Sequence, residues 1–142
     1  MSRSVNTEVI DLLAAAGVTE LTVPNTETKY SNSFLLEKNR SFALEVQFDV
    51  SSGAVSVKIE QEASGAEPAT EGAADDNFTV PRALGGGTGT DSLIDSGANT
   101  ELVRWYPFPP VVAPFQRIKL TGTGSNAASC RVTRLKIHQI EN

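Results

Sequence analysis

The sequence has very few of the residues that build catalytic or metal sites. Its 142 residues include one cysteine, Cys130, and one histidine, His138. A single cysteine forms neither an intrachain disulfide nor a cysteine metal cage, and a single histidine leaves little material for a His-rich metal site or a Cys/His catalytic pair. We therefore expect no metal ion and no cofactor. Cys130 is predicted to be a small buried apolar residue and His138 a half-exposed strand residue.

Long apolar runs are also absent. No stretch approaches the roughly 18 apolar residues of a membrane helix. The apolar segment 9–18 is interrupted by Asp11 and ends without a signal-peptide cleavage pattern. The sequence thus predicts a protein that is made in the cytoplasm and does not enter a membrane.

The overall composition is that of a folded protein. Hydrophobic residues make up 39% of the chain and charged residues 20%, which is typical of globular proteins and not of disordered ones. A chain of this length supports one hydrophobic core. We predict a single domain over residues 1–142.

The net charge of −5 is unevenly distributed. Residues 1–103 carry six Lys/Arg and sixteen Asp/Glu, whereas residues 104–142 carry six and one. The basic side chains of the last third lie in two strand-like segments: Arg117, Lys119, Arg131, Arg134 and Lys136. They either pair across strands with acidic neighbours such as Glu45 and Glu60 or form a basic contact face. Nucleic acid is not an expected partner, because the chain is acidic and does not interleave basic residues with stacking aromatics.

Alternation of apolar and polar residues predicts strands along most of the chain. Segment 41–50 places Phe42, Leu44, Val46, Phe48 and Val50 on one face, as in a half-buried strand. Segment 55–60 alternates in the same way, and the turn residues 51–53 between the two predict a β-hairpin. Further strands are expected over 20–23, 28–36, 102–105, 116–121 and 129–140, with a turn at Pro24-Asn25.

Two segments depart from simple alternation. In the last strand, Cys130 and Val132 share one parity while Leu135 and Ile137 share the other, which predicts a β-bulge near Thr133-Arg134. Residues 6–17 fit either a short helix or an edge strand, so residues 1–19 are interpreted as a short helix or an N-terminal arm.

Residues 63–100 differ in composition from the rest of the chain. They are rich in Gly, Ala, Ser, Thr, Asp and Pro, which predicts a long loop that protrudes toward a partner, with Phe78 and Val80 pinning its middle. Seven or eight short strands with almost no helix predict an all-β fold, a β-sandwich or a jelly roll.

Three loop segments contain residue types that are used in chemistry. Residues 93–98 resemble the active-site loop of retroviral-type aspartic proteases, in which Asp95 would pair with its symmetry mate in a homodimer; the flap and second apolar strand of that family are missing after Ala98. The Gly-rich run 85–90 lacks the Lys of a phosphate-binding loop. Residues 75–77 lack the spaced ligands of a calcium loop. We interpret these last two segments as a hinge and a solvated acidic loop.

An aromatic and proline-rich corner spans residues 105–110. Its rings either plug one end of a sandwich or form an oligomer interface, and stacking on a sugar is a third interpretation. The candidate interface residues are therefore Trp105, Tyr106, Phe108, Arg117, Lys119, Arg131 and Arg134.

Three segments together resemble small virion proteins of tailed bacteriophages, in particular capsid decoration or cement proteins. These segments are 9–15, the strands of 42–60, and 114–122 with its return strand. The resemblance implies a non-enzymatic, often trimeric subunit that is made in the host cytoplasm and bridges major capsid proteins on the virion, so the expected partners are the major capsid protein and copies of itself. The alternatives are the aspartic protease, a carbohydrate-binding β-sandwich module, and a tail or baseplate component.

Overall fold

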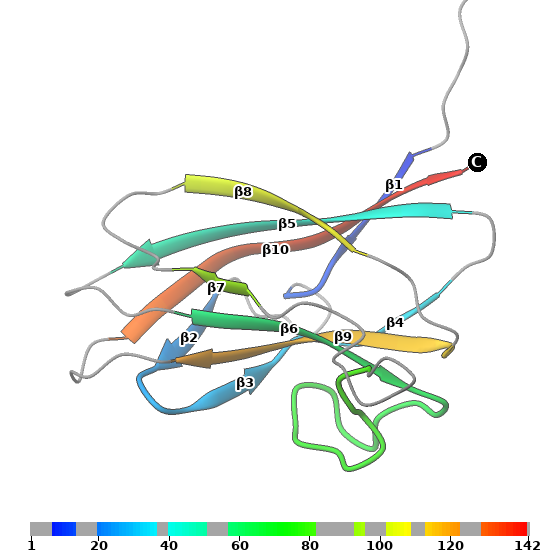
Figure 1. The fold of residues 1–142 in the computed structure, drawn as a ribbon, viewed down its shortest axis with the longest axis horizontal. Helices are drawn as coiled ribbons and strands as arrows, with labels where there is room; N and C mark the ends of the chain where they lie inside the picture. The colour runs from blue at the N-terminus through cyan, green and yellow to red at the C-terminus, as the bar shows by residue number, and fades with distance from the viewer. Residues whose placement is uncertain are drawn as a thin grey trace, which may run out of the picture.

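The computed structural model describes residues 7–13, 20–36, 40–50, 57–81, 93–95, 102–108, 113–122 and 129–141. These residues form ten strands and no helix, arranged as two antiparallel sheets packed against each other (Figure 1). The predicted all-β sandwich is confirmed.

Sheet A has the strand order β1-β10-β5-β8, and β2 also pairs with β10. Its strands are β1 (Thr7–Asp11), β2 (Leu21–Pro24), β5 (Arg40–Val50), β8 (Leu102–Pro107) and β10 (Ser129–Glu141). Sheet B has the order β3-β9-β6-β7, and β4 also pairs with β9. Its strands are β3 (Thr28–Tyr30), β4 (Phe34–Leu35), β6 (Val57–Ser64), β7 (Leu93–Asp95) and β9 (Phe115–Gly122).

The core lies between the two sheets and follows from the alternation in each strand. On β5 the predicted inward residues Leu44, Val46 and Phe48 are buried, and they face Ile118 and Leu120 of β9 within one apolar cluster. Burial of this kind stabilises the fold by about 25 cal/mol per Å² of apolar surface. Each sheet thus has one apolar inner face and one outer face.

The predicted hairpin between segments 41–50 and 55–60 is wrong. Both edges of β5 are occupied, by β10 and β8, and both edges of β6 are occupied by β9 and β7 in the other sheet. Alternation shows which residues of a strand face the core, but it does not select the partner strand. Here the chain changes sheet between β5 and β6.

Two other predictions about β10 and the N-terminal segment are resolved. The register between β10 and β5 shifts between Val132 and Arg134, and Val132, Leu135 and Ile137 are all buried, so the predicted bulge is confirmed. Residues 7–11 form an edge strand against β10, which is the second of the two interpretations of this segment.

A close backbone approach joins the two sheets at the turn after β2. Gly122 of β9 donates its amide to the carbonyl of Glu27 and accepts from the amide of Thr26. A Cβ atom on Gly122 would lie too close to the carbonyl oxygen of Pro24 for any side chain to fit. Position 122 of β9 therefore has to be glycine, because the turn between β2 and β3 packs directly against its backbone.

Part of the predicted loop 63–100 packs on the sandwich. Residues 65–81, called the strap below, follow β6 and lie against sheet B, and the Ala63 and Thr79 backbones form a bridge (Figure 1, green). Phe78 is buried and Val80 is half-buried. This burial agrees with the prediction that the two residues anchor the middle of the loop. Residues 93–95 add β7 to sheet B, and residues 82–92 and 96–100 lie outside the described residues.

Candidate functional site

Exposed apolar side chains gather on the outer face of sheet A. In the part of the chain that the structure describes, five large apolar residues are exposed by 40 to 56%: Val9, Leu35, Val103, Trp105 and Ile140. All except Leu35 belong to strands of sheet A.

The strand register places these four side chains on one face. Val9 lies opposite His138, which lies opposite Ala43, which lies opposite Pro107. Directly opposed residues of an antiparallel pair point to the same side of a sheet, and this side alternates along each strand. Val103, Trp105 and Ile140 share the parity of this row, whereas the buried Leu44 and Ile137 have the opposite parity. The outer face of sheet A therefore carries four exposed large apolar side chains, on β1, β8 and β10, among polar and charged ones.

A charged network lies at the centre of this surface. Glu45 of β5 bonds through one carboxylate oxygen to Nε2 of His138 at 2.8 Å and through the other to Nη1 of Arg134 at 2.9 Å. Burial would raise the pKa of Glu45, but the hydrogen bonds from His138 and Arg134 outweigh it and hold this pKa below its usual value. Glu45 is thus an ionised carboxylate whose two oxygens are both occupied.

Trp105 is held in place over this network. Its ring centroid lies 4.5 Å from that of His138, with the rings tilted by 53°, and the same His138 is bonded to Glu45. The indole is nevertheless 54% exposed. A large aromatic side chain with restricted motion loses little conformational entropy on binding, which is why such residues often anchor interfaces.

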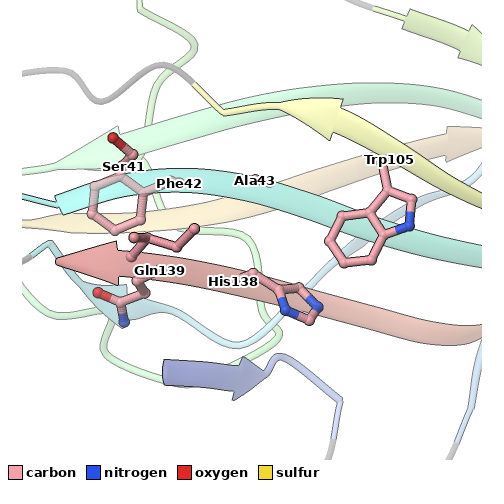
Figure 2. A pocket seen from close by; sticks show the side chains of 7 residues that line it. Ser41, Phe42, Ala43, Trp105, His138 and Gln139 are labelled. Carbon is pink, nitrogen blue, oxygen red and sulfur yellow. The ribbon is translucent and has the colours of Figure 1, made fainter. Parts of the chain in front are cut away.

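A hollow of about 430 Å³ lies beside Trp105 (Figure 2). It is lined by two runs of three residues and the indole: Ser41, Phe42, Ala43, Trp105, His138, Gln139 and Ile140. The hollow exists because the outward positions of β5 at this end hold the small side chains of Ser41 and Ala43, while the neighbouring strands carry Trp105, His138 and Ile140. In Figure 2, Trp105 and His138 stand at one end of the hollow and Ser41 and Phe42 at the other.

The polar groups at the centre of this surface are bonded to one another. Both oxygens of the Glu45 carboxylate and Nε2 of His138 are engaged within the network, so these atoms are not open to a ligand. Within the described ranges there is no group of three His, Cys, Asp or Glu side chains that could hold a metal ion. What the surface offers is a fixed aromatic ring, a hollow and an apolar surround.

The aromatic corner is divided between the two faces of sheet A. Phe108 is buried, with its ring 5.6 Å from that of Phe34 and 6.3 Å from that of Phe42, and Tyr106 packs against the core. These two residues plug the end of the sandwich, as the first interpretation of the corner proposed. Of the three aromatic side chains, only that of Trp105 is largely exposed.

The basic candidates are also separated. Arg134 lies on the outer face of sheet A beside Glu45, which agrees with the predicted cross-strand pairing. Arg131 lies on the same face farther along β10 and pairs with Glu20 at 3.6 Å. Lys119 lies on the outer face of sheet B, opposite Glu60 in the register. These residues do not form one basic face.

Arg117 is not available for contact with a partner. Its side chain is 1% exposed, and Nε bonds to Glu62 at 2.8 Å while Nη1 donates to the carbonyl of Ala73 at 2.7 Å. Its guanidinium lies 4.1 Å from the ring centroid of Tyr30 and 4.3 Å from that of Phe78. The sequence marks Arg117 as one basic residue among several on an alternating strand. Only the fold shows that the strap covers it.

The loop segments that contain catalytic or ligand residue types have mainly structural surroundings. Asp75 accepts backbone N–H bonds from Asn77 and Ala69, which hold its pKa below the usual value and organise the strap. Asp95 ends β7, opposite Val57 at the edge of sheet B. Residues 96–98 and the Gly-rich run 85–90 lie outside the described residues.

Sequence reasoning did not identify several residues of the site. The sequence predicts strands at Ala43 and Ile140 and either a helix or an edge strand at Val9, and it contains no signal that brings the three residues together. Their outward parity can be read from the alternation of each strand, but the β1-β10-β5-β8 order that assembles them cannot.

Comparisons of the chain with protein-family models, with curated proteins and with solved structures gave no match. In the part of the chain that the structure describes, no helix has the length and hydropathy of a membrane span. The function is therefore inferred from the residues and their geometry.

Proposed function

We propose that this chain is a non-enzymatic structural subunit of a tailed-phage virion, of the capsid decoration type, and that it docks on protein neighbours through the outer face of sheet A. The observation that carries the docking proposal is the concentration of exposed apolar side chains on this one face, around Trp105. The virion assignment is supported by the family resemblance of segments 9–15, 42–60 and 114–122.

The face has the physical properties of a docking surface. Large apolar side chains that gather exposed on one face of a protein often mark an interaction site. Aromatic anchors with a polar surround are typical of interface cores. The Glu45 side chain is only 8% exposed, and its bonds to Arg134 and His138 are already made. A partner that covers this face therefore does not leave the Glu45 carboxylate buried without a counter-charge.

The test is to purify particles from the phage or prophage that encodes the chain and to quantify its proteins by mass spectrometry. The proposal expects the chain at a fixed ratio to the major capsid protein. Particles made with Trp105→Ser in place of the wild-type chain should lose most of it. Leu35→Ser is the matched control, because Leu35 is exposed by 56% but lies on β4 in sheet B. Absence of the wild-type chain from particles, or equal loss of the two variants, would refute the proposal.

A carbohydrate-binding module is the second candidate, and the exposed indole beside a hollow favours it. Sugar sites combine an aromatic ring with several open hydrogen-bonding groups, whereas Nε2 of His138, which lines this hollow, is bonded to Glu45. Saturable binding of the wild-type chain to a glycan array, abolished by Trp105→Ala, would replace the docking proposal. Cleavage of a peptide library that Asp95→Asn abolishes would replace it with the aspartic protease.

A further inference from the structure

We propose that the outer face of sheet A binds a second copy of this chain across a two-fold axis, with Trp105 of each copy seated in the hollow beside Ala43 of the other. This inference rests on the proposed function, because both require a protein to dock on this face. It adds that the docked protein is a second copy of the same chain.

The first argument is shape. A two-fold interface is isologous, so one surface must carry both the projecting group and the cavity that receives it. Here the projecting indole of Trp105 forms one wall of the hollow, so both elements lie on the same face (Figure 2). A two-fold axis in the plane of the interface, midway between ring and hollow, brings each ring over the other copy's hollow. The volume of about 430 Å³ is within the roughly 300–1,000 Å³ of drug-sized pockets, which is enough for an indole.

The second argument is charge. Two-fold symmetry places identical faces against each other, so a face of one sign would repel its own copy. On this face Arg134 pairs with Glu45, and Lys136 lies opposite Asp11 in the register. The positive and negative side chains are thus interspersed, and neither sign dominates. Farther along β10, Arg131 is paired with Glu20.

The third argument is area, which also sets the strength. Four strands about 4.8 Å apart and roughly seven residues of about 3.3 Å each give close to 450 Å² per copy, or ~900 Å² for the pair. This estimate lies near the lower limit of about 1,000 Å² for a specific interface. We therefore expect a weak dimer, with a Kd on the order of micromolar.

The experiment is sedimentation of the purified full chain over a concentration series. Wild type should show a reversible monomer–dimer equilibrium. Trp105→Ser removes the central anchor and should weaken the Kd by about 30-fold, the effect of a hot-spot residue. Ala43→Phe fills the hollow but keeps the indole and should weaken the Kd to a similar extent. Leu35→Ser should leave it within about twofold. Circular dichroism and thermal unfolding check that all variants fold.

A mixture of the two weakened variants tests the geometry itself. Trp105→Ser keeps the hollow and lacks the ring, whereas Ala43→Phe keeps the ring and lacks the hollow. A mixed dimer regains one of the two ring–hollow contacts, while each variant alone forms none. Labelled Trp105→Ser should therefore associate with Ala43→Phe several-fold more tightly than either variant associates with itself.

Several outcomes would overturn the inference. A monomeric wild type at several hundred micromolar would do so, as would a trimer, or a mixture that associates no better than its components. These results separate the inference from the proposed function. A monomer that is still incorporated into particles through Trp105 keeps the virion proposal and removes the second copy, and a dimer that is absent from particles does the reverse.

Discussion

Replacing Arg117 of β9 by methionine should cost more stability than any single change within the strap that covers it. This substitution keeps a long apolar side chain but leaves the Glu62 carboxylate, which is 6% exposed, without its partner. Removing one member of a buried ion pair typically costs about 3–5 kcal/mol, because the remaining charge is buried and uncompensated. The rings of Tyr30 and Phe78 on either side of the guanidinium add cation–π attraction of up to ~2 kcal/mol each when desolvated.

The loss is smaller than most of the expected range of the total stability, so the variant should still fold and the loss can be measured. A chain of 142 residues has a free energy of unfolding of about 7–21 kcal/mol at 0.05–0.15 kcal/mol per residue. An unfolding entropy of about 2.1 cal/mol/K per residue converts a loss of 3–5 kcal/mol into a Tm decrease of about 10–17 °C. Urea unfolding at pH 7, followed by circular dichroism, gives the free energy directly.

The double variant Arg117→Met/Glu62→Met separates the ion pair from side-chain packing. Because it removes both charges, it should recover at least half of the loss caused by Arg117→Met alone. Lys58→Met is the control on the same sheet, since Lys58 pairs with Glu60 at 3.6 Å in a more exposed position and should cost under about 1 kcal/mol. Hydrogen exchange should show faster opening at Phe78 and Thr79 only when Arg117 is changed. Two results would contradict this reasoning. One is a cost of less than about 1 kcal/mol for Arg117→Met. The other is a double variant whose loss equals the sum of the losses of Arg117→Met and Glu62→Met, because additivity would mean that the ion pair does not stabilise the fold.

Three further changes test other parts of the structure. The pKa of Glu45 lies below its usual 4.5, so its bonds contribute stability above this pH that is lost as the pH falls through the lowered folded-state value. Glu45→Gln should therefore reduce the acid dependence of urea unfolding, and unchanged dependence would contradict this. Gly122→Ala should cost at least about 2 kcal/mol, because its Cβ would meet the carbonyl of Pro24, whereas Gly65→Ala has no atom within 4 Å of the new Cβ and should change stability by less than about 0.5 kcal/mol. Gln139 is fully buried, and neither amide atom has a partner among the described residues. Gln139→Met should thus stabilise by about 1 kcal/mol in thermal unfolding, while Gln61→Met, which strands Gln116, should destabilise, and a loss at position 139 would show that its amide is satisfied.

Much of the architecture could be predicted from local patterns. The faces of β5 and the bulge in β10 follow from side-chain parity, because an apolar residue on the wrong face would lose its burial. The pairing of strands could not be predicted in the same way. The turn residues after Val50 suit a hairpin, but the free energy of the fold is lower with β5 between β10 and β8. Pairing between strands that are distant in the sequence depends on the packing of the whole chain. Turn residues and local alternation do not reveal which strands will pair.

The same limit explains which site residues could be predicted. Trp105 is conspicuous because it is the only tryptophan, but Ala43 matters through its small size beside larger neighbours on β8 and β10. Arg117 illustrates the opposite error. A charged residue on an alternating strand is predicted to be solvated unless another part of the chain covers it, and here the strap does so.

The outer faces of the two sheets differ in how much of them the rest of the chain covers. On sheet B, the strap covers Arg117 and its own Phe78 is buried there, so this part of the outer face is shielded from water by the same chain. On sheet A, the described residues place no comparable segment over Trp105, Val103 and Ile140, although the Glu45 carboxylate on this face is buried and paired. Covering a surface whose central polar groups are already paired costs little desolvation free energy, and it removes the surrounding apolar side chains from water. This asymmetry is the reason that we propose sheet A, and not the basic residues of the C-terminal third, as the docking face.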